Sequence, residues 1–182
     1  ASTDFIGFKE TEEKTEQLDA FYSKLKFSQV TPKFALQYLF PSSGILYATV
    51  TKGYKTGGFN TSFEREEDRS FRPETSWNYE VGGKHPFLDN RLRADIAFFW
   101  IDWKNQQISQ TLPSGRGSML TNAGRSESKG VEVSLQGNPV NGLMVQVNYG
   151  FTHATFKDYV DEKKKIDYSG NYLPMVPSHT FA

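Results

Sequence analysis

The stretch Leu143–Thr152, LMVQVNYGFT, decides the fold because its residues change character at every step. Apolar or aromatic side chains occupy every second position: Leu143, Val145, Val147, Tyr149 and Phe151. The positions between them hold Met144, Gln146, Asn148, Gly150 and Thr152. Successive side chains of a β-strand point to opposite faces of the sheet, so this period of two predicts a strand with one apolar and one polar face.

Five further segments repeat the alternation, and the breaks between segments alternate in length. The segments are 33–40, 45–54, 77–82, 91–103 and 130–136. Short breaks rich in Pro, Gly, Ser or Asn follow one segment, and long polar stretches follow the next. Successive connections of an up-and-down meander lie at opposite ends of its sheet. We therefore expect short turns on one rim and long loops on the other.

Composition restricts the class of protein. The chain has 182 residues, of which 37% are hydrophobic, and its mean hydropathy is -0.58. No apolar run approaches the ~20 residues of a membrane helix, which excludes a helical membrane protein. A membrane β-barrel is not excluded, because each strand shows lipid only every second residue. Without cysteine there are no disulfides or thiolate metal sites, and 21 basic against 21 acidic residues argue against a nucleic-acid partner.

Five phrases occur in order along the chain: TPKFALQYLF, ILYATVTKGYKTGGFN, FRPETSWNYEVGGKHPFLDNRLRADIAFFWIDWKNQQI, TNAGRSESKGVEVSLQG and GLMVQVNYGFTHATF. From about Val30 to its end, the chain thereby resembles the barrel of TonB-dependent outer-membrane receptors. The resemblance implies a barrel of roughly twenty-two strands around a plug, since such large barrels carry plugged interiors. The chain shows no plug, no TonB box and too few strands for closure. We therefore expect a fragment of the wall, near the receptor's C-terminus but not at it.

The expected fold is all-β, an antiparallel up-and-down meander that forms part of a large transmembrane β-barrel. Residues 30–182 are expected to supply about six to seven strands of this partial barrel. Residues 1–29 are expected to form an extracellular loop segment. Helical spacing of Leu18, Phe21, Tyr22 and Leu25 predicts a short amphipathic helix there, from about Thr11 to Lys26, and an irregular loop is the alternative.

The long loops carry candidate ligand-binding residues. These are Tyr54, Phe59, Arg69, Phe71 and Arg72. Aromatic rings and guanidinium groups suit an anionic, ring-bearing ligand such as a catecholate siderophore, through charge, stacking or cation–π contacts. Aromatic side chains that only pack the rim are the alternative interpretation.

The polar strand faces carry a second set of candidates. These are Glu80, Lys84, Arg93, Asp95 and Glu132. Exposure to lipid would cost a few kcal/mol for each charge, so we expect these side chains to face the lumen. There they either line a ligand path, hold the plug by ion pairs, or simply form the wet face of amphipathic strands.

Other polar groups predict no chemistry. The acidic run Glu64, Glu66, Glu67 and Asp68 is interleaved with Arg65 and Arg69 and indicates a solvated loop rather than a cation site. The three histidines lack metal-ligand spacing, and no Ser/His/Asp set converges. We therefore predict no cofactor, no metal and no enzymatic activity. Trp77, Trp100 and Trp103 lie near strand ends, where indole rings favour the headgroup level, and packing against aromatic neighbours is the alternative.

The expected function follows from the resemblance. It implies a segment of a bacterial outer-membrane transporter that takes up a scarce nutrient, with a ferric siderophore as the expected ligand. The implied partners are the TonB energising complex, acting through a plug absent from this chain, outer-membrane lipid, and the siderophore-like small molecule. The alternative is a soluble antiparallel β-sandwich or adhesin-like binding module, whose apolar face would pack on a second sheet.

Overall fold

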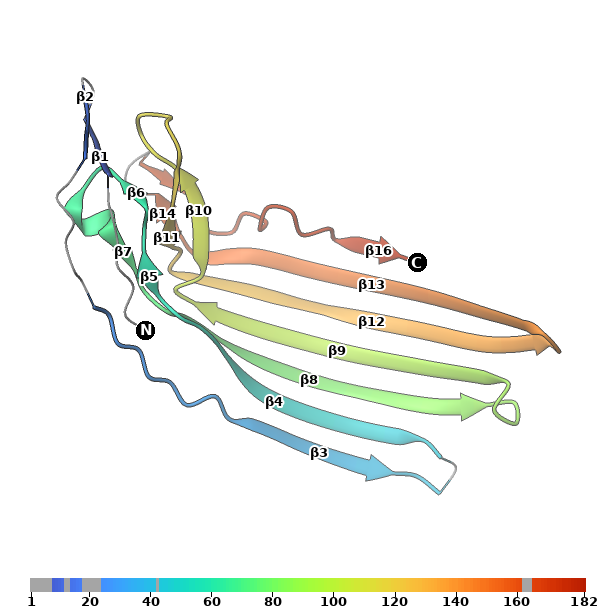
Figure 1. Ribbon diagram of the computed structural model, residues 1–182. Coiled ribbons are helices and arrows are strands. Elements are labelled where there is room, and N and C mark those ends of the chain that lie inside the picture. The colour runs from blue at the N-terminus through green and yellow to red at the C-terminus, as the bar shows by residue number, and fades with distance from the viewer. Residues whose placement is uncertain (1–7, 12–13, 18–23, 42, 162–164) are drawn as a thin grey trace.

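The computed structural model describes residues 8–11, 14–17, 24–41, 43–161 and 165–182. Figure 1 shows one long sheet with a group of shorter strands at one end. The long sheet contains β3 (Lys33–Leu39), β4 (Ile45–Lys55), β8 (Glu74–Phe87), β9 (Leu92–Lys104), β12 (Arg125–Val140), β13 (Leu143–Asp158) and β16 (His179–Phe181). Its order is β16-β13-β12-β9-β8-β4-β3, and every neighbouring pair is antiparallel. The predicted up-and-down meander is confirmed.

The connections sort by length between the two ends of the sheet, as the sequence predicts. The connections from β3 to β4, from β8 to β9 and from β12 to β13 are short and lie at one end. Those from β4 to β8, from β9 to β12 and from β13 to β16 are long loops at the other end (Figure 1). In the turn after β8, the Arg91 amide donates to the Leu88 carbonyl at 3.0 Å. Asp89 and Asn90 have φ values of 53° and 67° there, which matches the twist of a two-residue hairpin turn.

Short strands build the loop end. The first long loop contains β5 (Gly58–Phe59), β6 (Ser62–Phe63), the 3-10 helix η1 (Glu66–Arg69) and β7 (Ser70–Phe71). The second contains the hairpin of β10 (Gln107–Thr111) and β11 (Ser118–Asn122), and the third contains β14 (Val160–Asp161) and β15 (Ile166–Asp167). No helix in the described ranges is long and apolar enough to cross a membrane.

The predicted helix from Thr11 to Lys26 is wrong for the residues that the structure describes. Strands β1 (Phe8–Thr11) and β2 (Lys14–Gln17) pair antiparallel, and β1 also pairs parallel with β6 of the first long loop. Residues 24–26 have no regular structure, and residues 18–23 lie outside the described ranges. Pairing with a distant loop supplies backbone partners that local spacing cannot reveal, and such tertiary context overrides helical propensity.

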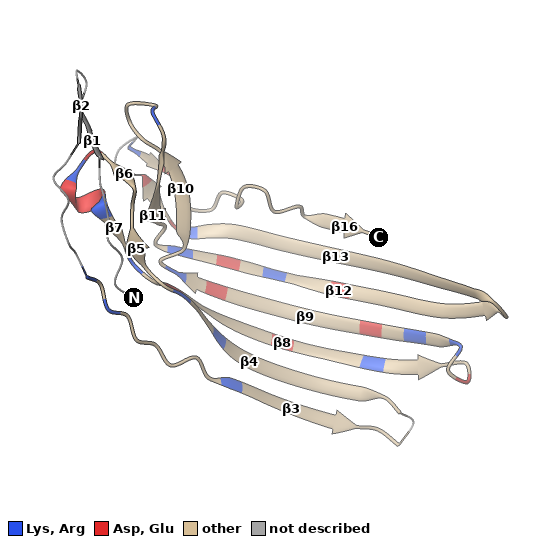
Figure 2. Cartoon of the chain, viewed as in Figure 1, with Lys and Arg blue, Asp and Glu red and all other residues tan. Residues whose placement is uncertain are grey.

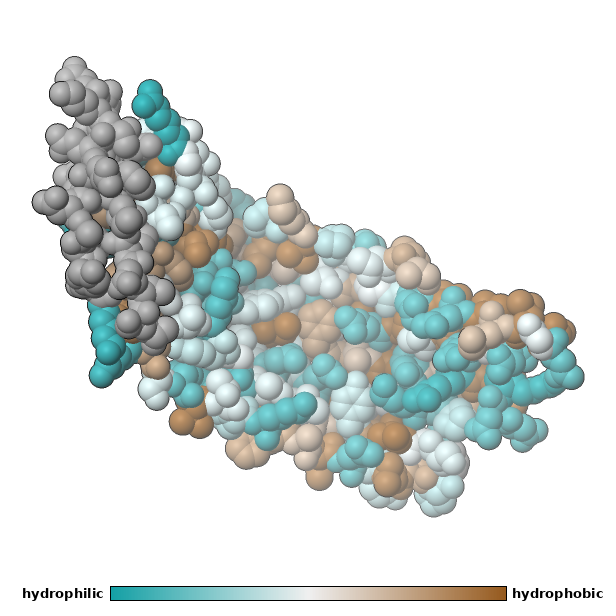
Figure 3. All heavy atoms as spheres, viewed as in Figure 1, coloured by the Kyte–Doolittle hydropathy of each residue, from teal (hydrophilic) through white to brown (hydrophobic). Residues whose placement is uncertain are grey.

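The register puts the apolar positions of neighbouring strands on one face. Val131 of β12 lies opposite Phe98 of β9 and Phe151 of β13. Exposed members of this apolar face include Phe34, Leu36, Leu46, Val81, Ile96, Phe98, Leu135 and Val147. Leu36 is 76% exposed and Phe98 is 52% exposed, so nothing in the described chain covers this surface. Figure 3 shows hydrophobic residues interspersed with hydrophilic ones over the side of the sheet that it presents.

The buried hydrophobic residues gather near the loop end instead. They are Phe63, Leu112, Met119, Ala123, Ala154, Phe156, Tyr159 and Leu173. Among the described residues, the strands of the long sheet contact one another and no second sheet packs over them. A β-sandwich would bury the apolar face against such a second sheet. This face instead requires an apolar medium outside the described chain.

Two glycines on the polar face lie under aromatic rings. Tyr47 lies opposite Gly82, and Phe99 lies opposite Gly130. A Cβ atom at Gly130 would overlap the carbonyl oxygen of Phe151 and lie 2.7 Å from Phe99 Cζ. Only glycine permits this close approach, which lets an aromatic ring cover the bare backbone.

We predict that Gly130→Ala destabilises the barrel by about 1–3 kcal/mol, the usual cost of inserting a methyl group into packed structure. Gly137→Ala in the same strand is the matched control, because its Cβ would meet nothing nearer than 3.4 Å. Urea titration of the full-length receptor, followed by the heat-dependent shift of its electrophoretic mobility, measures both variants. Equal midpoints for the two variants would contradict this account of Gly130.

Candidate functional site

The aromatic loop candidates divide between two elements of the first long loop and its border. Phe59 lies in β5 and Phe71 in β7, and these strands pair with Gly58 opposite Phe71. The structure therefore places these two aromatic residues in one small sheet. Tyr54 is not part of it, because Tyr54 lies in β4 opposite Thr75. All three side chains are half-buried.

The two arginine candidates differ in whether their guanidinium groups form ion pairs. Arg69 is half-buried, forms an ion pair with Glu66, and places its guanidinium 5.7 Å from the ring centroid of Phe63. Arg72 is exposed, and its side chain forms no ion pair with the described residues. Arg72 is therefore the better candidate for contact with an external anion.

Asn122 of the second long loop fixes the backbone of Arg72. The Arg72 amide donates to Asn122 Oδ1 at 2.8 Å, and Asn122 Nδ2 donates back to the Arg72 carbonyl at 3.0 Å. Gln107 Nε2 donates to the same carbonyl at 3.2 Å and to the Thr56 carbonyl at 2.8 Å. The second loop thus determines where Arg72 presents its guanidinium group.

Asn60 makes a second clamp between the same loops. It is 4% exposed, and its Nδ2 donates to the carbonyls of Asp68 at 2.7 Å and Leu120 at 2.9 Å. Its Oδ1 accepts from the Leu120 amide at 2.8 Å. One side chain therefore satisfies both backbone groups of a residue sixty positions away in sequence.

Our sequence interpretation missed these clamping residues. Asn60 ends the phrase GGFN, Asn122 begins NAG, and Glu74 belongs to the Pro-Glu pair. Glu74 Oε2 accepts from the Gln107 amide at 2.8 Å. The signal was present in the phrases that carry the family resemblance, but periodicity assigns such loop residues no partner.

An aromatic cluster connects the second loop to the third. Tyr159 stacks on Tyr168 with ring centroids 5.4 Å apart and packs against Phe156 at 5.0 Å. Gln110 of β10 hydrogen-bonds the Tyr159 hydroxyl. Burial raises the pKa of the Tyr159 phenol, and the nearby Asp161 carboxylate adds to this effect. The three long loops are therefore joined side to side.

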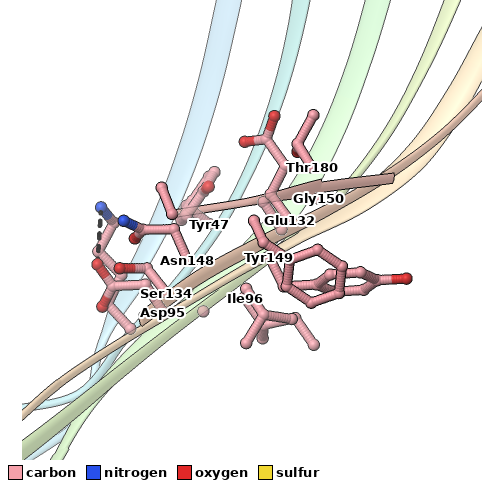
Figure 4. A pocket seen from close by; sticks show the side chains of 15 residues that line it. Tyr47, Asp95, Ile96, Glu132, Ser134, Asn148, Tyr149, Gly150 and Thr180 are labelled. Carbon is pink, nitrogen blue, oxygen red and sulfur yellow. Dashed lines mark ion pairs between the residues drawn. The ribbon is translucent and has the colours of Figure 1, made fainter. Parts of the chain in front are cut away.

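The register places all five charged strand candidates, Glu80, Lys84, Arg93, Asp95 and Glu132, on the polar face. Asp95 forms ion pairs with two of them: Arg93 Nε donates to its Oδ1 at 3.2 Å, and Lys84 Nζ lies 3.6 Å from its Oδ2. Lys84, Asp95 and Glu132 also line a hollow of about 400 Å³. Figure 4 shows Tyr47, Asp95, Ser134 and Asn148 on one side of the sheet. Arg93 and Glu80 do not line this hollow.

Three residues of the acidic run have partners in the first and second long loops. Glu67 pairs with Arg65 at 3.1 Å, Glu66 pairs with Arg69, and Glu64 Oε1 accepts from the Ser114 amide at 2.9 Å. Within the described ranges, no group of three or more His, Asp or Glu side chains is arranged to hold a metal ion.

The three tryptophans do not all lie on the same face of the sheet. Trp77 and Trp100 flank Tyr79 on the apolar face near the loop end, with ring centroids 6.4 Å and 5.1 Å from the tyrosine ring. Placement at the headgroup level and packing against aromatic neighbours are therefore compatible there. The headgroup prediction is wrong for Trp103, which lies opposite Ser76 on the polar face.

Comparison with known protein families shows to which family the chain belongs. The family model described as TonB dependent receptor-like, beta-barrel matches residues 5–182. The chain belongs to this family. Membership, together with the relatives below, confirms the predicted all-β barrel fold and the outer-membrane location, and the soluble sandwich is not favoured. The family consists of receptors and transporters, which agrees with the prediction that the chain is not an enzyme.

Two curated relatives are receptors. The ferric-pyoverdine 358 receptor of Pseudomonas putida is 29% identical over 163 residues, which cover 88% of this chain and 18% of the relative. The pesticin receptor of Yersinia pestis is 30% identical over 154 residues, which cover 83% of this chain and 21% of the relative. The chain therefore spans about a fifth of the length of these relatives.

Solved structures show the same fold. The ferric yersiniabactin uptake receptor FyuA from Yersinia pestis matches with a TM-score of 0.66 at 24% identity, over 84% of this chain and 22% of that one. The ferric-catecholate import receptor Fiu from E. coli K12 matches with a TM-score of 0.57 at 20% identity, over 99% of this chain and 26% of that one.

We predict that Asn60→Ala loosens the first two long loops. The substitution removes the partners of the half-buried backbone groups of Leu120, which costs up to about 1–3 kcal/mol for each unsatisfied group. Limited proteolysis of whole cells should cleave these loops faster than in the wild type. Asn171→Ala, at an exposed asparagine of the third loop, is the matched control. Equal cleavage rates for the two variants would show that Asn60 does not hold the two loops together.

We further predict that alkaline pH loosens the contact between the second and third loops. A phenol whose pKa is raised in the folded state keeps its proton above pH ~10, where the unfolded side chain ionises. The stability from its packing is therefore lost as the pH rises from about 10 through the raised pKa. Loop proteolysis should therefore accelerate as the pH rises above about 10. Tyr159→Phe should reduce this dependence and Tyr172→Phe, at an exposed ring, should leave it intact.

Proposed function

We propose that this chain supplies wall and extracellular loop surface to an outer-membrane transporter for a ferric siderophore. The observation that carries the proposal is the position of Arg72. It is an exposed cation without an ion pair to any described residue, it follows Phe71 in sequence, and Asn122 of another loop holds its backbone. A fixed cation beside aromatic rings suits an anionic, ring-bearing ligand. Relatives named for ferric pyoverdine and ferric yersiniabactin support this ligand class.

The division of labour follows the faces of the sheet. The apolar face meets lipid, and the interlocked loops meet the medium outside the cell and capture the ligand. The polar face, with Lys84, Asp95 and Glu132, lines the passage inside the barrel. Energy comes from the TonB complex, which acts through a plug that this chain does not contain. Transport needs no covalent chemistry, so the residues act by charge, shape and exclusion.

Pre-organisation distinguishes Arg72 from the other candidates. Arg69 already balances its charge against Glu66, and a ligand would have to displace that carboxylate. Ordering a free loop on binding costs conformational entropy, whereas a loop already held by Asn122 and Gln107 avoids much of that cost. We therefore assign Arg72 the main electrostatic role, with Phe71 and Phe59 as aromatic neighbours.

We predict that Arg72→Gln weakens ferric-siderophore binding about tenfold, as expected when a hydrogen bond to a charged group is lost. Arg65→Gln is the matched control, because Arg65 is an exposed arginine of the same loop that pairs with Glu67. Whole cells grown without iron and given ferric pyoverdine, ferric yersiniabactin or a ferric catecholate measure binding and iron uptake. The proposal fails if none of these complexes is taken up, or if both variants bind like the wild type.

A further inference from the structure

A group of charged residues lies on the apolar face, beyond its aromatic side chains at the loop end. We call Asp102, Arg125, Glu127, Lys129 and Lys157 the rim cluster. The register places four of its members on the apolar face, where Lys129 lies opposite Trp100 and Glu127 lies opposite Asp102. Lys157 joins them through its ion pair with Glu127. Charges on this face need an explanation, because the same face meets lipid further along the strands. Figure 2 shows charged positions at the loop ends of β9 and β12.

The height of the cluster can be estimated from strand geometry. Leu92 begins the apolar face of β9 and Asp102 stands ten residues further along. At about 3.3 Å per residue and a tilt of about 40°, these positions differ in height by about 25 Å. That height equals the apolar band of an outer-membrane barrel, about 25 Å. The rim cluster therefore lies where acyl chains give way to headgroups.

The cluster is built with its anions inside and its cations outside. Side chains of Asp102 and Glu127 are 14% and 15% exposed, whereas those of Arg125, Lys129 and Lys157 are 50%, 56% and 45% exposed. Arg125 donates to Asp102 through Nε at 2.7 Å and Nη2 at 3.2 Å. The carboxylates thus position the cations and leave their outer sides open.

Glu127 joins the cluster to the aromatic side chains. Its carboxylate lies 3.4 Å from Lys129 Nζ and 3.2 Å from Lys157 Nζ, and it accepts the Trp100 indole N–H at 3.0 Å. Two lysines share one carboxylate, so one positive charge in this trio is not balanced. Lys104 and Asp158, which both lie opposite Arg125, offset each other in charge.

We propose that the rim cluster binds a phosphate group of an anionic lipid in the outer leaflet. Lys129 and Lys157 supply the charge, and Arg125, fixed by Asp102, supplies the planar donors that suit phosphate oxygens. The acyl chains of the same lipid lie on the apolar face below, beside Trp100 and Phe98. The site requires the outer-membrane location and is independent of the transported ligand.

The test uses the full-length receptor in neutral detergent and measures retention of diphosphoryl lipid A by native mass spectrometry. The double variant Lys129→Gln/Lys157→Gln should lower the apparent affinity about 25-fold, since each of the two basic residues near a membrane surface contributes about fivefold. Lys24→Gln/Lys26→Gln, which removes the same charge from exposed positions of the N-terminal segment, should leave it unchanged. Lys129→Arg keeps the charge and should retain binding, so it separates charge loss from misfolding.

Three further results decide the source of the phosphate and the nature of the partner. Fully dephosphorylated lipid A should bind equally to wild type and double variant. Inorganic phosphate should not displace the lipid, because it lacks the acyl chains, and full displacement would overturn the lipid assignment. Equal lipid affinity of the double variant and the wild type would overturn the proposal, as would a change confined to the fraction of dimeric receptor.

Discussion

Strand register is the constraint on which the rest of this structure depends. Inside a membrane no water is available to backbone amides and carbonyls, so each strand must satisfy them with its neighbours. Because side chains alternate with a period of two, the register that completes these bonds also decides which side chains meet lipid. A slip of β12 by one residue against β9 would turn Glu132 to the apolar face of the sheet and Val131 to the polar face.

The sheet could be predicted from the sequence because its rules are local. Alternation at Leu143–Phe151 and in five other segments gave the two faces, and loop length gave the two ends. The charged candidates fall on the polar face for the same reason. Trp103 was misassigned because its position near a strand end was weighed above the alternation of side chains, which alone puts Trp103 and Trp100 on different faces of β9.

The loop end could be predicted only in part, because its contacts join residues far apart in sequence. Spacing gave no sign that Asn60 reaches Leu120 or that Asn122 holds Arg72. The predicted N-terminal helix failed in the same way, since β1 pairs with β6 across some fifty residues. Of the ligand candidates, the structure brings Phe59 and Phe71 into one small sheet. It also distinguishes Arg72, which forms no ion pair with any described residue, from Arg69, which pairs with Glu66.

The two asparagine clamps restrict how the loops of such receptors can diversify. Each clamp needs a side chain on one loop and a backbone group on another, so neither loop can change its length or path without disturbing its neighbour. Exchange of one loop between two receptors would leave buried polar groups without partners. Receptors of this architecture should therefore acquire new surfaces by replacing adjacent loops as a set, and loop-grafting experiments should transplant them in the same way.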